Sequence, residues 1–265
     1  MRWPLASLLG ASVLLASSAA ASPAAPAALS RRAPVPAGGD VDFYNPLNRT
    51  GGHMLSILPD SDLGEPINVI ISGRSSKSVL SVEGFLLWAT SVHFGVSCLG
   101  QANGTQQLAN LGDGQGNQTQ GSGDGNNGVM RWNYYDPYIG TCKETLIGGN
   151  HFRWWQQIGP DANSGAYFLA VSNEANLARH HEIVVNGYNT GRDELVGNAT
   201  FPNGTTWEGN YYQATVEWIE AGVLLNDSSF GINHAPRVNP PGGEAQDGRV
   251  ALLTVIQTVV SPQAT

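Results

Sequence analysis

The sequence is poor in charge, and most of the charge it has is acidic. Charged residues make up 13% of the 265 positions, and 13 Lys and Arg stand against 21 Asp and Glu, for a formal net charge of −8. A chain with this balance lacks the basic surface that binds nucleic acid or anionic membranes. We therefore expect no nucleic-acid partner, and we expect a surface made polar by amides, hydroxyls and glycine.

Long apolar runs are also missing. The clearest one follows Arg2 and covers Leu5 to Ala16, about 12 residues, which is too short to cross a bilayer about 30 Å thick as a helix. Small residues then continue to Ala21. A positive start, a short apolar run and a small-residue exit are typical of a cleaved signal peptide. Residues 1–21 therefore predict a secreted, extracellular protein without a stable membrane span after cleavage, and a membrane anchor is the alternative.

A second cleavage is predicted within the leader. Residues 22–32 are rich in Ala and Pro and end in the pair Arg31-Arg32. We interpret this segment as a pro-segment removed by a secretory-pathway protease, with two solvated arginines as the alternative. Cleavage there would change the net charge from −8 to −11, because it removes three basic residues and no acidic ones. Residues 33–65 follow as an irregular entry segment.

Cysteine is scarce as well. The chain has two, Cys98 and Cys142, and no Cys-x-x-Cys spacing for a metal or a redox pair. In an oxidising compartment a pair of cysteines is more often bridged than free. We therefore predict a disulfide, which stabilises by ~4 kcal/mol in the loop-entropy model. Two buried thiols are the alternative.

Acceptor motifs for N-glycosylation are plentiful by comparison. The motif Asn-x-Ser/Thr becomes persuasive when it recurs behind a signal peptide, and it predicts exposed positions. The predicted sites are Asn48, Asn103, Asn117, Asn198, Asn203 and Asn226.

The pattern after the entry segment predicts one domain over residues 66–260. Residues 66–71 form an apolar, β-branched run typical of a buried strand, and apolar residues then recur at helical spacing over 76–93. Together they predict an α/β or α+β domain with a mixed sheet, a few flanking helices and long polar loops. The other predicted elements are strands at 129–135, 150–156, 166–172, 181–185, 213–219 and 249–260, and a brief helix at 192–197.

Residues 100–128 have a different composition, rich in Gly and Asn and without apolar periodicity. A loop of this length is functional or disordered. The run that begins at Asp113 resembles calcium-loop chemistry but lacks the bidentate Glu of an EF-hand. We interpret the segment as a glycosylated surface loop, and calcium binding is the alternative.

Reactive side-chain types are densest around the predicted strand pair. Alternation on a strand places His151, Arg153 and Trp155 on one face. The pair His180-His181 follows, and then Arg192-Asp193-Glu194. No Gly-x-Ser-x-Gly motif is present, which argues against a nucleophilic triad.

Three interpretations of these residues stay open. His151, one of the two later histidines and Asp193 are acceptable zinc ligands, although the spacing matches no local metal motif. Alternatively, the two arginines hold an anionic group while a histidine acts as acid or base. In the third interpretation, Arg153 pairs internally with Asp193 or Glu194 and the histidines have no special role.

The order of several short motifs resembles the LssY-like C-terminal domain, in the secreted single-domain form found in fungi. The resemblance covers residues 66–196 and extends loosely to 260. It implies no established reaction, and the lipid-phosphate module attached to bacterial relatives has no counterpart here. One departure is Gly191, where bacterial relatives tend to carry an acid. The motifs are Pro66–Gly73, His151-x-Arg153-x-Trp155, Ala166–Ser172, His181-x-Ile183 and Arg192-Asp193.

These observations predict a secreted binding protein with a His/Arg pocket for an anionic or carbohydrate ligand. The predicted ligand-binding residues are His151, Arg153, His181, Arg192 and Asp193. The tryptophans of the chain suit carbohydrate stacking, although their usual role is core packing. No cofactor is expected. The alternative is a secreted hydrolase that uses the same cluster with a divalent metal.

Overall fold

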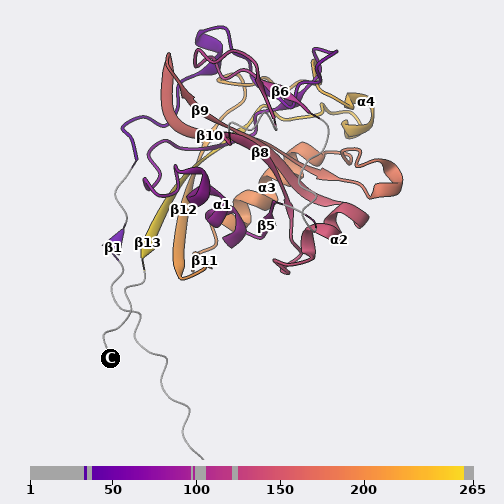
Figure 1. Ribbon diagram of the computed structural model, residues 1–265. Helices are drawn as coiled ribbons and strands as arrows, with labels where there is room; N and C mark the ends of the chain where they lie inside the picture. The colour runs from indigo at the N-terminus through magenta and orange to yellow at the C-terminus, as the bar shows by residue number, and fades with distance from the viewer. Residues whose placement is uncertain (1–32, 35–37, 97, 99–105, 121–124, 260–265) are drawn as a thin grey trace, which may run out of the picture. The chain divides into compact units, whose positions relative to one another are not determined.

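Strands dominate the computed structural model of the chain (Figure 1). The predicted signal peptide, the predicted pro-segment at 22–32 and Asn103 lie outside the described residues. The structure describes residues 33–34, 38–96, 98, 106–120 and 125–259.

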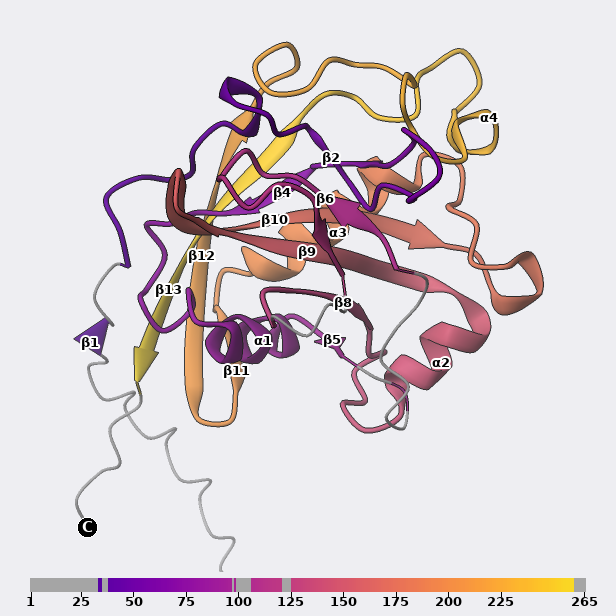
Figure 2. The same ribbon diagram turned by 45° about the horizontal axis from the view of Figure 1, so that its top comes forward.

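A nine-stranded mixed sheet confirms the predicted α+β architecture. The strand order is β11-β12-β13-β4-β10-β9-β8-β5. The ninth strand, β1, pairs with β13 in addition to these neighbours. Every neighbouring pair is antiparallel except β13 and β4. The sheet is curled, so that β12 and β13 run steeply across β9 and β10 (Figure 2). The strands are β1 (Ala33–Pro34), β4 (Val69–Ile71), β5 (Phe94–Gly95), β8 (Asn127–Trp132), β9 (Gly149–Gly159), β10 (Ala162–Glu174), β11 (Thr205–Trp207), β12 (Asn210–Ile219) and β13 (Val250–Val259).

The long hairpin β9–β10 is the predicted strand pair, and both strands run further than predicted. His151 pairs with Ser172 and Trp155 with Phe168 in its register. Alternation then sorts the side chains by face. Phe152 and Trp154 belong to the core on the inner face, and Trp155 belongs to the core on the outer face. His151 and Arg153 lie on the same face of β9 as Trp155, as the sequence predicted.

Two helices cover the inner face. Helix α1 (Val82–Ser91) begins at Ser81, whose Oγ accepts a hydrogen bond from the Gly84 amide at 3.1 Å. It is shorter than predicted because a turn occupies residues 77–80. Helix α3 (Gly187–Ala199) extends the predicted brief helix in both directions. Phe85 stacks on Tyr167 with ring centroids 4.0 Å apart, and burial of each large apolar side chain of this kind stabilises by ~1.5–3 kcal/mol.

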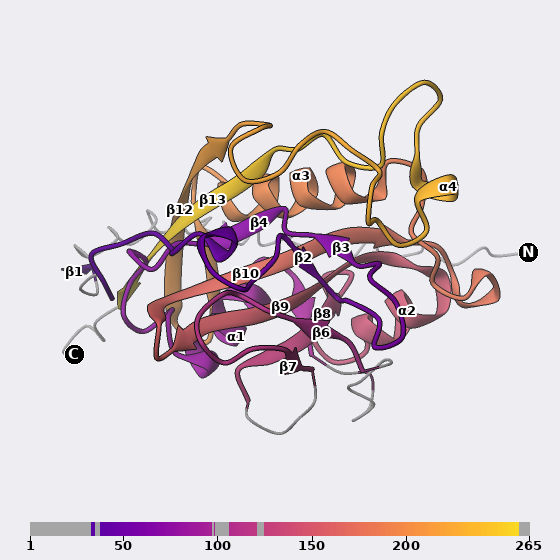
Figure 3. The same ribbon diagram turned by 90° about the horizontal axis from the view of Figure 1, so that it is seen from above.

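The outer face is covered by segments that the sequence predicted to be irregular. Leu55 from the entry segment, and Ala109 and Leu111 from the Gly/Asn-rich segment, are buried against it. The described part of that segment therefore packs on the sheet instead of forming a surface loop. Figure 3 shows these segments along β9 and β10. Their strands are β2 (Met54–Leu55), β3 (Glu65–Pro66), β6 (Leu108–Ala109) and β7 (Gln118–Thr119).

The chain beyond β8 holds two further helices, and the predicted disulfide joins one of them to Cys98. Helix α2 (Gly140–Ile147), which the sequence did not predict, carries Cys142, and Cys142 is bridged to Cys98. Helix α4 is a single turn (Ala235–Val238). The strand predicted at 181–185 is wrong. His181 has φ 55°, a left-handed conformation incompatible with a strand, and only an isolated bridge joins Ile183 to Glu174 there.

Candidate functional site

Two of the predicted site residues meet at a glutamate that the sequence analysis did not name. Glu174 ends β10. Its Oε1 lies 3.3 Å from Nε2 of His151, and its Oε2 lies 3.3 Å from Nδ1 of His181. His151 also faces Ser172, with Nδ1 at 3.2 Å from the carbonyl oxygen. One carboxylate therefore joins a strand histidine to a loop histidine.

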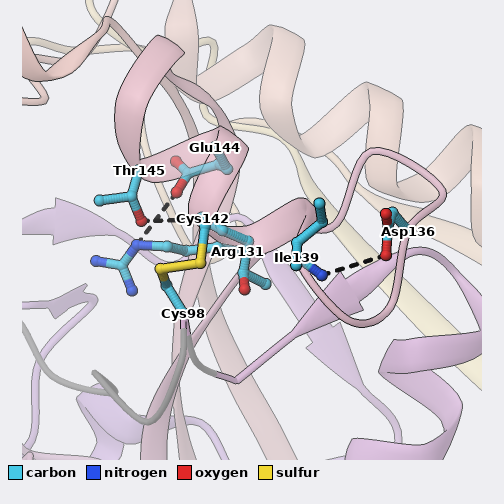
Figure 4. Close-up of a disulfide and its surroundings, with 8 residues drawn as sticks. Cys98, Arg131, Asp136, Ile139, Cys142, Glu144 and Thr145 are labelled. Carbon is cyan, nitrogen blue, oxygen red and sulfur yellow. Dashed lines mark hydrogen bonds and ion pairs between the residues drawn. A yellow bond between two sulfur atoms is a disulfide. The ribbon is translucent and has the colours of Figure 1, made fainter.

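A second buried carboxylate lies beside the first. Glu144 on α2 is fully buried, and its Oε2 lies 3.2 Å from Nε of Arg131 (Figure 4). Arg131 pairs across β8–β9 with His151. The disulfide is two residues from Glu144 and fixes this end of α2 to the start of the β5–β6 connection. Among the described residues, neither carboxylate oxygen of Glu144 accepts a hydrogen bond.

These groups form what we call the Glu174 cluster, consisting of Arg131, Glu144, His151, Glu174 and His181. One donor atom each from Glu144, Glu174 and His181 lies within 4.8 Å of the other two. Two carboxylate oxygens and an imidazole nitrogen are ligands that zinc and related divalent ions accept. The geometry could therefore hold a metal ion.

The surroundings shift the protonation equilibria of the Glu174 cluster in opposite directions. Burial, reinforced by the charge of Glu174, raises the pKa of Glu144 to about 8. Burial also acts to raise the pKa of Glu174, but the facing His151 and His181 lower it below its usual value. Its contact with Glu174 raises the pKa of His181, whereas burial lowers the pKa of His151 to about 4. At neutral pH, His151 is therefore neutral while Glu174 is ionised.

Arg153 lies on the same face but has different partners. Its guanidinium contacts Oε1 of Gln120, and the side chain is 7% exposed. Burial lowers its pKa, and attraction to Glu65 and Glu174 acts in the opposite direction. Burial likewise raises the pKa of Glu65 to about 7. Arg153 is thus a buried cation beside the cluster.

Arg192 and Asp193 belong to a separate set of ion pairs. Arg192 donates to both oxygens of Asp247 and to the carbonyl of Arg249 at 2.9 Å, and it is 1% exposed. Its Nε donates to Asp193 at 2.8 Å. Among the described residues, Arg192 forms ion pairs with Asp193 and Asp247, and neither belongs to the Glu174 cluster. The prediction that all five candidate residues share one pocket is therefore not supported by these contacts.

Gly191 on α3 lies where a side chain would not fit. A Cβ added there would lie 2.8 Å from Cα of Ser172. Helix α3 therefore approaches β10 more closely than any side chain at this position would permit. This approach excludes an acidic side chain at position 191.

A groove of about 810 Å³ opens beside Glu174. Tyr135 stands at its mouth with 71% of its surface exposed, and its ring lies 5.4 Å from that of Trp132 in an edge-to-face arrangement. Tyr134 and Tyr135 have φ of 49° and 62°, conformations that cost free energy and are concentrated at functional sites. The lining residues are Trp132, Tyr134, Tyr135, Gly149, Asn150, Asn173, Glu174, Val184, Glu194, Gly197 and Asn198.

No family model, no curated protein and no solved structure matches the chain. The resemblance to the LssY-like domain therefore stays a prediction. Within the described ranges, no helix has the length and apolar character needed to cross a membrane.

Sequence reasoning missed both glutamates of the candidate metal site. Glu174 could have been found, because extending the predicted strand 166–172 by two residues places it on the face of Ser172, opposite His151. Glu144 had no comparable signal. The α2 sequence has little amphipathic pattern, and only the tertiary fold buries this side chain.

Proposed function

We propose that the protein is a secreted glycoprotein that binds a carbohydrate in the groove beside Glu174. The observation that carries the proposal is the exposed ring of Tyr135, held at the mouth of the groove by a strained turn. The Asn133 side chain supports this turn by accepting a hydrogen bond from the Tyr135 amide at 2.9 Å. An exposed aromatic ring held rigidly at a concave surface offers a stacking platform for a sugar at low entropic cost.

The polar lining favours a neutral ligand. The amides of Asn150, Asn173 and Asn198 offer both donors and acceptors, and Glu174 and Glu194 offer acceptors. Such groups match a ligand rich in hydroxyls. Among the described residues that line the groove there is no Lys, Arg or His. Of the two ligand classes that the sequence suggested, a carbohydrate is therefore favoured over an anion, which the two carboxylates would repel.

Secretion and glycosylation complete the proposal. The disulfide between Cys98 and Cys142 suits an oxidising compartment. The acceptors Asn48, Asn117, Asn203 and Asn226 are exposed, as modification requires. Asn198 is half-buried and lines the groove, so a glycan attached there would compete with a ligand. Binding is best measured on protein carrying Asn198→Gln as well as on the natural sequence.

A matched pair of tyrosines tests the proposal. Tyr135→Asn removes the ring and suits the left-handed backbone, because Asn tolerates positive φ. Tyr138 is 84% exposed and does not line the groove, so Tyr138→Asn is the control. The probes are neutral oligosaccharides of glucose, mannose and N-acetylglucosamine, with sulfated and uronic-acid oligosaccharides for comparison. Affinity is measured by titration calorimetry.

We expect saturable binding of at least one neutral oligosaccharide. Tyr135→Asn should weaken it about tenfold or more, as loss of a central aromatic contact does, and Tyr138→Asn should leave it unchanged. Binding of the anionic probes alone, or equal affinities in both variants, would refute the proposed groove.

A secreted hydrolase is the second candidate. Glu174 and Glu194 both line the groove. Most glycoside hydrolases use a pair of carboxylates as their catalytic groups. This candidate predicts that a bound oligosaccharide is slowly cleaved and that Glu194→Gln abolishes the cleavage. Unchanged oligosaccharide after prolonged incubation would leave binding as the function.

A further inference from the structure

Glu144 is a buried carboxylate whose partners do not satisfy it. Its side chain is 0% exposed, and within the described residues both oxygens lack a hydrogen-bond donor. Nε of Arg131 lies 3.2 Å from Oε2 as an ion pair, but it does not make a hydrogen bond to either oxygen. An unsatisfied buried polar group costs ~1–3 kcal/mol, more when it is charged. In native proteins such a group has a specific explanation, and a bound water or ion is one of the common ones.

The same deficiency recurs in the two groups that face Glu144. Oε2 of Glu174 and Nδ1 of His181 are also buried without a hydrogen-bond donor or acceptor among the described residues, although they lie 3.3 Å apart. These atoms converge with Glu144 within 4.8 Å. When Nδ1 of His181 is unprotonated, the three atoms are electron-pair donors gathered around one position, an arrangement that suits a cation.

We propose that Glu144, Glu174 and His181 bind one divalent transition-metal ion, with zinc as the best match. Zinc accepts imidazole nitrogen and carboxylate oxygen as ligands, and zinc sites with three protein ligands keep a fourth position open. Calcium takes six to eight oxygen ligands and magnesium prefers oxygen ligands and water, so both match this set less well.

The residues around the three ligands are arranged to support a metal. His151 lies 3.3 Å from the other oxygen of Glu174, and Ser172 in turn faces His151. Arg131 lies beside Glu144, and the disulfide anchors the helix that carries it. Metal-binding carboxylates and histidines are commonly oriented by such outer contacts.

The site has access to solvent on one side. The side chain of His181 is 24% exposed and that of Glu174 is 12% exposed, and Glu174 also lines the groove. A bound ion would therefore lie at the edge of the groove. The inference does not rest on carbohydrate binding: Glu174 is shared with the groove, but Glu144 and His181 are not among the residues that line it.

Calorimetric titration of the full chain with Zn²⁺, after removal of bound metal by a chelator, tests the inference. We expect one saturable site per chain. Glu144→Gln keeps the volume of the side chain and removes a ligand oxygen, and it should weaken Zn²⁺ binding at least tenfold. His181→Asn keeps a residue that tolerates φ 55°, and it should weaken binding to a similar extent.

The neighbouring histidine provides the matched control. His180 has φ 54° on the same loop and is exposed, so His180→Asn should bind Zn²⁺ like the natural protein. Circular dichroism of each variant shows whether the fold is retained, and Co²⁺ absorption bands in the natural protein give a second readout if a variant fails to fold.

Several results would overturn the inference. These are no saturable Zn²⁺ site, equal affinity in Glu144→Gln and the natural protein, loss of binding in His180→Asn alone, or tighter binding of Ca²⁺ or Mg²⁺ than of Zn²⁺. Failure of the metal-site inference can be told apart from failure of the carbohydrate-binding proposal. Zn²⁺ binding without oligosaccharide binding refutes only the carbohydrate proposal, and the reverse result refutes only the metal site.

Discussion

Two clusters of charged side chains lie at α3 and β10. They differ in whether their polar atoms have hydrogen-bond partners. Arg192 is buried, and Asp193, Asp247 and the carbonyl of Arg249 accept its hydrogen bonds. The Glu174 cluster is also largely buried, yet donor atoms of Glu144, Glu174 and His181 lack hydrogen-bond partners among the described residues. A saturated ion pair is a structural device, whereas a convergent, unsaturated set of ligand atoms is a candidate binding site.

The disulfide is expected to give the largest effect, because it closes a loop with a sequence separation of 44 and holds α2 in place. Replacing both Cys98 and Cys142 by Ser should lower the free energy of unfolding by about 4 kcal/mol. It should also weaken Zn²⁺ binding, since Glu144 is on α2. Chemical denaturation and calorimetry of the same variant check both effects. An unchanged denaturation midpoint would show that α2 is held by its other contacts.

Arg192 should give the next largest effect and should act on stability alone. Arg192→Met removes the buried cation and leaves Asp247 and the carbonyl of Arg249 without their donor. We expect a loss of about 3 kcal/mol in the free energy of unfolding, measured by denaturant titration. Zn²⁺ affinity and oligosaccharide affinity should be unchanged in the folded variant. A variant of normal stability with impaired ligand binding would reverse our assignment of the two clusters.

Glu144→Gln should have a small effect on stability in chelator-treated protein. Among the described residues no hydrogen bond to the carboxylate is lost, and Arg131 is its ion-pair partner. Burial raises the pKa of Glu144 to about 8, so a neutral amide resembles the form that faces Arg131 at neutral pH. We expect a change of less than about 1 kcal/mol, far below that of Arg192→Met, by the same denaturant titration. A loss as large as that of Arg192→Met would show that Glu144 is a structural residue.

The smallest expected effect is on the pH dependence of stability in acid. The hydrogen bonds from Arg192 and from the Arg249 amide overcome the effect of burial and lower the pKa of Asp247. Because the folded pKa lies below the unfolded one, the contribution is present above the ordinary pKa of Asp and is lost as the pH falls through the lowered value. Asp247→Asn should therefore flatten the decline of stability with acidification. Thermal midpoints over an acid series check this, and parallel curves for variant and natural protein would contradict it.

The sequence predicted the structural features that arise from a local pattern of residues. It did not predict those that arise from tertiary contacts. Period-two alternation predicted the hairpin β9–β10 and the shared face of His151 and Arg153. Cysteine count and compartment predicted the disulfide. The strand predicted at 181–185 failed because the left-handed backbone of His181 has no apolar signature, and Glu144 was missed because only the packing of α2 buries it.

The candidate site was therefore half predictable. The two histidines could be named from their residue type, but the carboxylate that joins them ends a strand whose predicted end was two residues too early. Arg192 and Asp193 are charged, as a ligand site requires, but they pair with each other and with Asp247 and not with the histidines. Proximity in the sequence did not bring them into contact with His151 or His181.

Anomalous scattering at the zinc edge, from crystals of the full chain grown with Zn²⁺, tests the central claim most directly. We predict one strong peak bounded by Glu144, Glu174 and His181, with ligand distances of ~2.0–2.2 Å, and no peak at Arg192 or Asp247. A structure in which these three side chains remain without an ion at saturating Zn²⁺, or in which zinc occupies only exposed surface positions, would contradict the account.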